Sequence, residues 1–272
     1  MQEIKTDEKT GILYRESTVF GPKAIVVLVH GLCAHSGRWE FLAEALAAVS
    51  VKSYAIELQG FGETTQLKGY ISSFSYYFKD IIRLISLARE EHPNRKVFLC
   101  GQSMGGLLTF VMASITPSVA DGIICLSPAF KNMIPFSSFE KFKIIASLLY
   151  NRRKQFPVPF TAQMCTRDEG YQKILDNDNK APRRATSQML LNILIQQLCA
   201  HSVKGKLSLP VLFQLAGNDS MVDSKVSKEI FKELSIEDKT VIEYPEHVHA
   251  LSYDCDRNLV FDDIINWIFR RI

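Results

Sequence analysis

The sequence predicts an α/β protein whose sheet is mostly parallel and doubly wound. Apolar runs of strand length alternate with segments of helix length through most of the 272 residues, and such alternation is typical of βαβ units with right-handed crossovers. Residues 24–29 are continuously aliphatic, as expected of a strand that is buried on both faces. A third observation is the short run 96–100, which passes through a glycine-rich turn into the apolar helical run 107–113.

The remaining elements follow in chain order from the same patterns. Further strands are expected at residues 12–20, 53–58, 122–127, 210–215 and 240–244. Further helices are expected at residues 39–49, 73–91 and 224–234 and from about residue 258 onward. The helix 73–91 should end there because His92-Pro93-Asn94 follows, and proline cannot continue a helix.

The alternation breaks between residues 128 and 209. This stretch contains Pro157, Pro159 and Pro182, and it shows helical periodicity but no convincing strand. We therefore expect a sheet-based core formed by residues 1–129 and 208–272. A helical cap, residues 130–207, is expected to be inserted after the sixth strand.

Composition and charge restrict the class of protein. Apolar residues make up 47% of the chain and charged residues 22%, values that fit a globular protein with a sizeable core. The net charge of +3 and the lack of a basic stripe give no reason to expect nucleic acid as a partner. No run approaches the roughly 20 apolar residues of a membrane-spanning helix, and residues 1–9 do not resemble a signal peptide. The six cysteines form no C-x-x-C pair, so we expect a cytoplasmic protein with reduced thiols.

The turn at residues 101–106 carries a serine between glycines, in the order Gly101-Gln102-Ser103-Met104-Gly105-Gly106. At a junction between a strand and a helix this pattern is typical of a nucleophile elbow. The glycines are needed because the turn strains the serine backbone and a side chain at either flank would collide with neighbouring elements. Ser103 is therefore the predicted nucleophile.

A serine nucleophile needs a base and an orienting acid, and in this type of sheet both follow it on loops after later strands. Asp219 and Asp223 lie in the loop after the predicted strand 210–215. Asp219 is nearer the carboxyl end of the strand, where its carboxylate can reach a histidine on the neighbouring loop. Asp223 is expected to cap the helix that follows. We therefore predict Asp219 as the acid.

Two histidines compete for the role of base. His247 and His249 both lie in the loop after the last predicted strand. The other histidines precede the acid or lie outside a suitable loop, namely His30, His35, His92 and His201. Local reasoning leaves the choice between His247 and His249 open.

The oxyanion hole needs two backbone N–H groups that point at one position. One is expected from Met104, which follows the nucleophile at the amino end of a helix, where the helix dipole favours negative charge. The other is expected from the loop after the strand 24–29, where Leu32 is best placed. His30 is then expected to be structural, with its ring bridging loops.

Together these residues resemble the α/β-hydrolase superfamily, and within it the branch of monoacylglycerol lipases and lysophospholipases, also called serine aminopeptidase-like hydrolases. The similar motifs are the segments 30–39, 101–106, 217–223 and 244–251, and the closing helix after residue 256 matches without a gap. The resemblance implies an α/β-hydrolase fold with no metal or organic cofactor, and it puts the catalytic histidine at His249. Two positions depart from the branch. Gln102 replaces a histidine beside the nucleophile, and residues 57–64 differ from the usual loop.

In relatives that take lipid-like esters the inserted region is a cap over the active site, and the resemblance implies the same arrangement here. Phe136, Phe139, Phe142 and Leu148 belong to an apolar surface at helical spacing and are the predicted substrate-binding residues. Six basic residues and one acidic residue occur between residues 131 and 154. We expect the apolar surface to pack onto the pocket, with the lysines in water. The alternative is that this basic amphipathic segment contacts an anionic membrane surface, which would make the protein peripheral to a membrane.

The sequence thus predicts a serine carboxylester hydrolase that acts on lipid-like esters of the monoacylglycerol or lysophospholipid type. Its expected partner is a small-molecule ester or lipid substrate. A serine peptidase or amidase, or a thioesterase, would use the same three residues. The alternative from another class is a ligand receptor on the same scaffold, although all three residues for catalysis are present.

Overall fold

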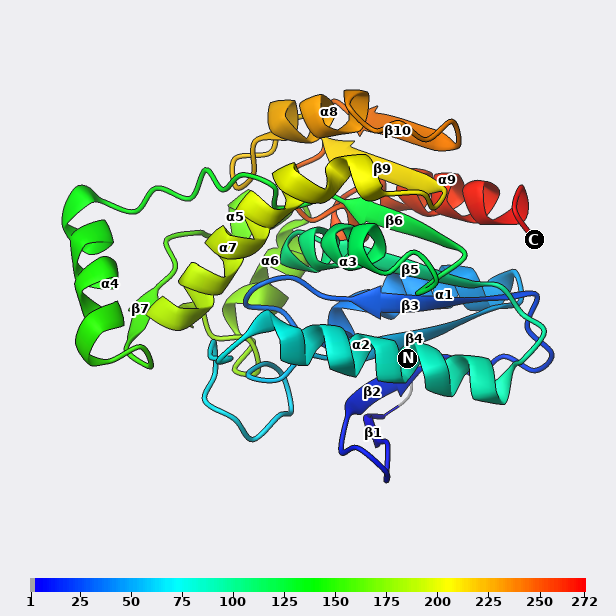
Figure 1. Cartoon of the computed structure of the whole chain (residues 1–272), viewed down its shortest axis with the longest axis horizontal. Helices are drawn as coiled ribbons and strands as arrows, with labels where there is room; N and C mark the ends of the chain where they lie inside the picture. The colour runs from blue at the N-terminus through cyan, green and yellow to red at the C-terminus, as the bar shows by residue number, and fades with distance from the viewer. Residues whose placement is uncertain (1–2) are drawn as a thin grey trace.

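The computed structural model describes residues 3–272 and has an eight-stranded sheet at its centre (Figure 1). The parallel strands are β3 (Ala24–Val29), β4 (Val51–Glu57), β5 (Val97–Gln102), β6 (Gly122–Leu126), β9 (Val211–Ala216) and β10 (Lys239–Tyr244). At one edge β1 (Lys5–Thr6) and β2 (Leu13–Glu16) pair in antiparallel fashion. The strand order is β1-β2-β4-β3-β5-β6-β9-β10. The predicted mostly parallel sheet is confirmed.

Helices cover both faces of the sheet, as a doubly wound fold requires (Figure 1). One face carries α1 (Glu40–Ala48) and α9 (Arg257–Phe269). The other face carries α2 (Phe74–Glu91), α3 (Met104–Ile115) and α8 (Ser224–Lys232).

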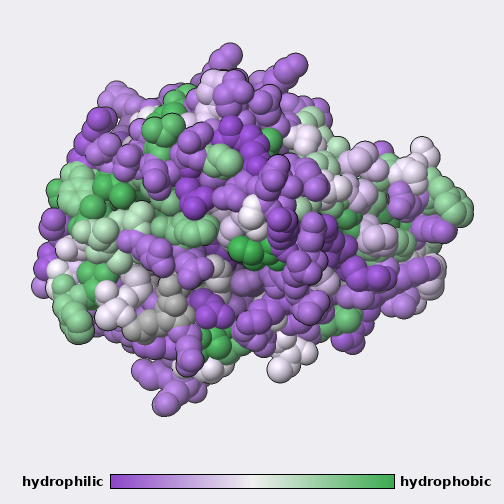
Figure 2. All heavy atoms as spheres, turned by 180° about the vertical axis from the view of Figure 1, so that it is seen from behind, coloured by the Kyte–Doolittle hydropathy of each residue, from purple (hydrophilic) through white to green (hydrophobic). Residues whose placement is uncertain are grey.

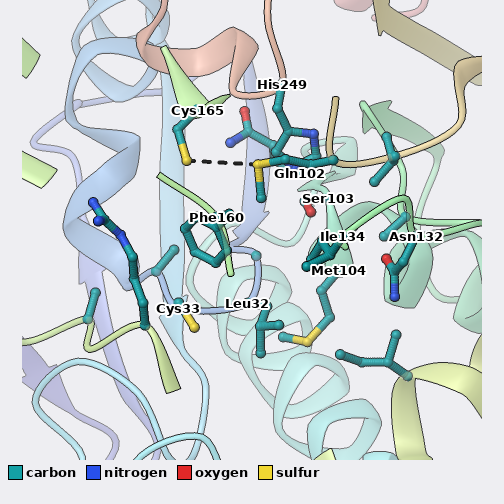
Figure 3. Close-up of a pocket in the computed structure, with 18 of the residues that line it drawn as sticks. Leu32, Cys33, Gln102, Ser103, Met104, Asn132, Ile134, Phe160, Cys165 and His249 are labelled. Atoms are coloured by element: carbon teal, nitrogen blue, oxygen red, sulfur yellow. Dashed lines mark hydrogen bonds between the residues drawn. The ribbon is translucent and has the colours of Figure 1, made fainter. Parts of the chain in front are cut away.

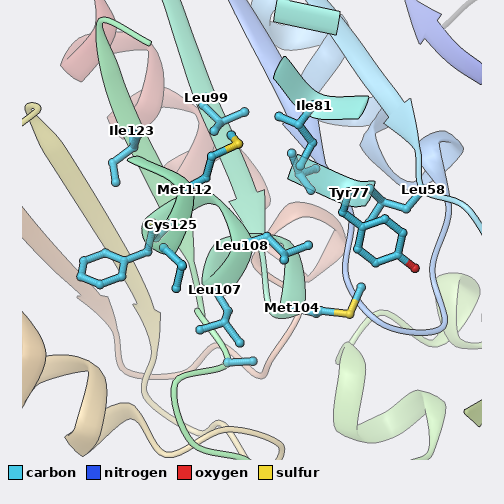
Figure 4. Close-up of a cluster of buried hydrophobic side chains, with 14 of the residues drawn as sticks. Leu58, Tyr77, Ile81, Leu99, Met104, Leu107, Leu108, Met112, Ile123 and Cys125 are labelled. Atoms are coloured by element: carbon cyan, nitrogen blue, oxygen red, sulfur yellow. The ribbon is translucent and has the colours of Figure 1, made fainter. Parts of the chain in front are cut away.

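The strand β3 shows how an unbroken apolar run supplies both halves of the core. Successive side chains of a strand point to opposite faces of the sheet. Val27 and Val29 therefore belong to the cluster beneath α2 and α3, which Figure 4 shows, whereas Val26 and Leu28 belong to the cluster beneath α1 and α9. All six residues of β3 are buried. A run that is apolar at every position is what such a two-sided core demands.

Local signals set several element boundaries. The helix α2 begins after Ser73, whose hydroxyl accepts a hydrogen bond from the N–H of Ser75, and it ends at Glu91, directly before His92-Pro93-Asn94. Both boundaries agree with the prediction. The predicted edge strand 12–20 is shorter than expected, because only the four residues of β2 pair with β4. Short 3₁₀ helices occupy η1 (Ser36–Trp39), η2 (Lys204–Lys206) and η3 (Leu251–Tyr253).

Between β6 and β9 the chain leaves the sheet and forms a group of elements at one end of the molecule (Figure 1). The helices are α4 (Ser138–Tyr150), α5 (Ala162–Cys165), α6 (Glu169–Asp176) and α7 (Ser187–Val203), and β7 (Gln155–Pro157) pairs with β8 (Arg184–Thr186). The expectation of no strand in this stretch was wrong. Strands of three residues, one of which ends in proline, are too short to show a period of two. Of the helices in residues 3–272, none is long and apolar enough to span a bilayer.

Candidate active site

Ser103 occupies a strained turn between β5 and α3. Its backbone angles are φ +57° and ψ −120°, a conformation that costs a residue with a side chain about 1–3 kcal/mol. A Cβ atom at Gly101 would lie 2.2 Å from the carbonyl oxygen of Gly105, and one at Gly105 would lie 2.0 Å from that of Val29. The flanking glycines thus allow α3 to pack closely against β5 and β3. The N–H of Ser103 donates to the carbonyl of Leu126 at 2.9 Å, which helps to hold the turn.

Asp219 and His249 meet on the loops that follow β9 and β10. Asp219 Oδ2 lies 2.8 Å from His249 Nδ1, and the two side chains are 1% and 5% exposed. The other carboxylate oxygen accepts hydrogen bonds from the N–H groups of Met221 at 2.8 Å and Val222 at 3.0 Å. Because Nδ1 of His249 is engaged, Nε2 remains for the pocket that both His249 and Ser103 line (Figure 3).

The competing residues occupy other environments. His247 packs its ring on Tyr244, with 5.2 Å between the ring centroids, and its Nε2 is buried with no partner among residues 3–272. Burial lowers the pKa of His247, which favours the neutral ring. Asp223 caps α8 by accepting a hydrogen bond from the N–H of Lys225, as predicted, and pairs with Lys131 at 3.0 Å. The structure therefore brings Asp219 together with His249, and neither His247 nor Asp223 takes part in that contact.

The two predicted oxyanion donors also border this pocket. Leu32 lies in the loop after β3, and Met104 is the first residue of α3. The His30 ring supports the Leu32 loop, because it accepts a hydrogen bond from the N–H of Leu58 at 3.1 Å and lies 2.9 Å from the carbonyl of Gly31. Burial lowers the pKa of His30 to about 3, so its ring is neutral near pH 7. The predicted bridging role of His30 is confirmed.

Both departures from the family pattern are accommodated by local hydrogen bonds. Gln102 is buried, and its Oε1 accepts a hydrogen bond from the N–H of Ser252 at 3.1 Å, which links the elbow to η3. Glu57 is also buried, and it accepts a hydrogen bond from the hydroxyl of Ser36 at 2.5 Å. Burial raises the pKa of Glu57. Neither substitution removes a group from the pair formed by Asp219 and His249.

The pocket above Ser103 is lined by the sheet core on one side and by residues 129–193 on the other. Its apolar lining includes Ile134, Phe136, Phe160, Leu190 and Ile193. The thiols of Cys33 and Cys165 also border it (Figure 3), and burial raises the pKa of each to about 12, so both are protonated. No sequence signal marks three of these lining residues, Phe160, Leu190 and Ile193. They belong to no motif, and only the folded chain brings their distant segments to the pocket.

The predicted cap residues divide into two groups. Phe136 lines the pocket, whereas Phe139, Phe142 and Leu148 do not belong to its lining. The side chains of Phe139 and Phe142 are 65% and 67% exposed. The expectation that this surface packs onto the pocket was therefore wrong for α4. Phe136 precedes the helix and turns inward, but most of the apolar side chains of α4 lie on its outer face.

Asp178 fastens the segment after α6 to the loop after β3. Its carboxylate accepts hydrogen bonds from His35 Nε2 at 2.9 Å and from the guanidinium of Arg38. His35 Nδ1 accepts a hydrogen bond from the N–H of Gly37 at 3.0 Å, so Nε2 carries the hydrogen and donates the hydrogen bond to Asp178. Burial opposes the charge on Asp178, but the hydrogen bond from His35 and the charge of Arg38 outweigh it and lower the pKa to about 2.

Comparison with known proteins places the chain in a family. The profile of the family described as "Serine aminopeptidase, S33" matches residues 21–256. Monoglyceride lipase of Homo sapiens is 26% identical over 258 residues, which cover 92% of this chain and 84% of that protein. Phospholipase YtpA of Bacillus subtilis is 26% identical over 248 residues, or 88% of this chain and 93% of that protein. The crystal structure of Paleococcus ferrophilus monoacylglycerol lipase has a TM-score of 0.84 at 24% identity and covers 96% of this chain and 99% of that chain. The chain belongs to the serine aminopeptidase S33 family of α/β-hydrolases.

Proposed function

We propose that this serine hydrolase cleaves carboxylic esters with Ser103 as nucleophile, His249 as base and Asp219 as acid. The observation that carries the proposal is the 2.8 Å contact between Asp219 and His249 beside a pocket whose floor is the strained Ser103 elbow. A serine hydroxyl is a weak nucleophile, so it needs a base that is held in one tautomer. A buried carboxylate at Nδ1 fixes that tautomer and stabilises the imidazolium when it forms.

The proposed reaction has two halves. Ser103 Oγ attacks the ester carbonyl while His249 Nε2 removes its proton, and the N–H groups of Leu32 and Met104 donate to the oxyanion of the tetrahedral intermediate. His249 then returns the proton to the leaving alcohol as the C–O bond breaks, which leaves an acyl-enzyme on Ser103. Water, deprotonated by His249, then attacks the acyl carbon, the bond to Ser103 Oγ breaks, and His249 returns the proton to Ser103 Oγ as the acid is released. No metal or organic cofactor takes part in these steps.

We propose lipid-like esters, of the monoacylglycerol or lysophospholipid type, as the substrates. The apolar lining formed by Ile134, Phe136, Phe160, Leu190 and Ile193 suits an acyl chain. The relatives called monoglyceride lipase and phospholipase support the same class. An aminopeptidase would need an acidic group to receive the substrate ammonium, but the charged side chains among the described lining residues are those of Arg38 and Arg183. We also propose that residues 130–207 form the cap over this site.

The first experiment is mass spectrometry of the protein after reaction with a fluorophosphonate, with the Ser103→Ala variant as control. We expect one adduct on Ser103 and none on the variant. Turnover of monoacylglycerols of increasing chain length, of a lysophospholipid, of an acyl thioester and of an aminoacyl amide then defines the substrate. Absence of the adduct would overturn the mechanism. Faster turnover of the amide or thioester would replace the ester assignment. Slow acylation with the acyl group retained would instead indicate a ligand receptor.

We further propose that the outer face of the cap contacts anionic membrane surfaces. The helices α4 and α7 contact each other and carry exposed apolar side chains, namely Phe139, Phe142, Ile145, Leu149, Tyr150, Leu194, Ile195 and Leu198. Hydrophobic residues are visible at this end of the molecule in Figure 2, among hydrophilic ones. The cations Lys141, Lys143 and Lys154 belong to the same helix or follow it, and Lys143 Nζ lies 4.0 Å from the centroid of the Phe139 ring. Lysines around an apolar face suit the boundary between acyl chains and anionic headgroups.

This contact can be tested by sedimentation with phosphatidylcholine vesicles that contain or lack phosphatidylglycerol. We expect binding that requires phosphatidylglycerol, weakens with salt and is lost in the Leu149→Ser variant. Phe20→Ser is the matched control, because Phe20 is also 92% exposed but lies outside the cap. Equal loss in both variants would contradict a specific membrane face. If Leu149→Ser instead abolishes a dimer in the absence of vesicles, the partner of this face is a second copy of the chain.

A further inference from the structure

We propose that Asp254 is a positioning residue for His249. Its carboxylate connects the loop that contains His249 with residues 165–167 of the cap. This inference rests on the proposed catalytic role of His249. Asp254 lies between η3 and α9, and its side chain is completely buried. None of the motifs in the sequence analysis included it.

Both oxygens of the Asp254 carboxylate are engaged by donors from two separate regions. Oδ1 accepts hydrogen bonds from the N–H of Arg167 at 2.7 Å and from the hydroxyl of Thr166 at 3.2 Å. Oδ2 accepts from Arg167 Nε at 2.9 Å and from the N–H of Val248 at 3.1 Å. A buried carboxylate is tolerated only when it is paired and hydrogen-bonded in this way. One charge therefore joins the cap to the residue that directly precedes His249.

The other flank of the histidine is also attached to the cap. The N–H of Ala250 donates to the carbonyl of Cys165 at 2.9 Å, at the end of α5. On the side of the acid, the carbonyl of His247 accepts from the N–H of Asn218 at 3.0 Å, and Asn218 precedes Asp219. Residues 247–250 thus have one backbone contact to the loop that contains Asp219. They have two attachments to the cap, one directly through Cys165 and one through Asp254.

These attachments bear on catalysis because proton transfer tolerates little displacement. The position of the His249 ring follows from its backbone and from the Asp219 contact, and an error of about 1 Å can reduce the rate about 100-fold. If Asp254 loses its acceptor for the N–H of Val248, the backbone beside His249 is held less firmly. If the Arg167 side chain is removed, the Asp254 carboxylate still accepts the hydrogen bond from the N–H of Val248. It no longer forms an ion pair with the cap.

The decisive variant is Asp254→Asn, which keeps the shape of the side chain but replaces one acceptor oxygen with an amide nitrogen. Rates are measured on enzyme whose folded, active fraction has been titrated. We expect kcat to fall about 10- to 100-fold while KM changes less than twofold, because the pocket walls are untouched. Fluorophosphonate labelling of Ser103 should slow by a similar factor. The proton NMR signal of the hydrogen bond between His249 and Asp219 should broaden or shift.

A second variant covers the case in which Asp254→Asn fails to fold. Arg167→Gln removes the donor Nε from a side chain that is 31% exposed, and it should lower kcat in the same way but less. The matched control is Tyr54→Phe, which removes a contact to Glu91 without altering a residue that lines the pocket. It should lower stability and leave kcat unchanged.

The outcomes separate the two proposals. Variants at Asp254 and Arg167 that unfold more easily but keep the kcat and labelling rate of the parent would overturn the positioning role and leave the proposed triad standing. Failure of the parent enzyme to be labelled at Ser103 would overturn the triad, and the positioning role with it.

Discussion

The inner and outer parts of the proposed cap, residues 130–207, are attached to the rest of the molecule in different ways. In the inner part, residues 162–178, the carboxylates Asp254 and Asp178 join cap and core by hydrogen bonds to Arg167, His35 and Arg38. In the outer part, of the described residues 138–150, Ser147 alone is buried. The helix α4 is stabilised at its start by a capping box between Ser137 and Glu140 rather than by an extensive tertiary contact.

The two parts of the proposed cap therefore suit different kinds of contact. Buried charged hydrogen bonds are directional, and they fix the cap segment beside His249 in one arrangement. An exposed apolar face has no preferred partner geometry, so it can accept a surface that has no fixed shape, such as the boundary of a bilayer. The part of the proposed cap that adjoins His249 is therefore hydrogen-bonded to the core, whereas most side chains of α4 are exposed.

The largest effect is expected at the contact between Asp219 and His249, which lies in the core beside the inner part of the proposed cap. We expect Asp219→Asn to reduce kcat by about 10³- to 10⁴-fold, because the amide no longer holds the imidazole in the required tautomer. Steady-state ester hydrolysis measures this loss. The matched control is Asp223→Asn in the same loop, which should leave kcat within about twofold because Asp223 caps α8. An equal loss in both variants would mean that the loop, and not the acid, is responsible.

The second test removes the contact that Asp178 makes with His35 and Arg38 in the inner part of the proposed cap. Asp178→Asn should destabilise the protein by no more than about 2 kcal/mol at pH 7, since the pKa of this carboxyl is lowered from 3.8 to about 2 in the folded state. A lowered pKa means that the stabilisation is present above pH 4 and is lost as the pH falls toward 2. The difference in unfolding free energy between parent and variant, measured in urea, should be constant from pH 5 to 7 and shrink below pH 4. A difference that does not depend on pH would exclude the charge as its cause.

The smallest change in unfolding free energy is expected for the exposed helix α4. Leu149 is 92% exposed, so Leu149→Ala should change the unfolding free energy by less than about 0.5 kcal/mol. Leu207→Ala is the matched control near the end of the cap, because Leu207 is 3% exposed, and it should cost about 2–4 kcal/mol. Thermal or urea unfolding compares the two. A large cost at Leu149 would show that its face is covered in solution.

Much of the fold was predictable because its signals are local. The run at residues 24–29 indicated a strand buried on both faces. The strand β3 occupies those residues, and one half of the core packs on each of its faces. Ser73 and His92-Pro93-Asn94 marked the two ends of α2. The strands β7 and β8 were missed because each has three residues, which is shorter than any window in which a period of two can be recognised.

Chain order limits which residues can be proposed for the candidate site. The elbow motif indicated Ser103, and the order of loops indicated Asp219 but left His247 and His249 as alternatives until the family resemblance favoured His249. The structure places His249 against Asp219, and the backbone of residues 247–250 is hydrogen-bonded to Asn218, Asp254 and Cys165. No local pattern contains that information.

Local sequence patterns are enough to indicate the alternation of strands and helices, the elbow at Ser103 and the loops that carry its proposed partners. These features depend on residues within a few positions of one another. Which face of α4 is uncovered, and which carboxylate lies beside the proposed base, depend instead on how the whole chain packs. Asp254 and Arg167 are 87 positions apart in the chain, so their contact depends on the path of everything between them. An amphipathic helix likewise specifies that it has an apolar face, but its neighbours decide whether anything covers it.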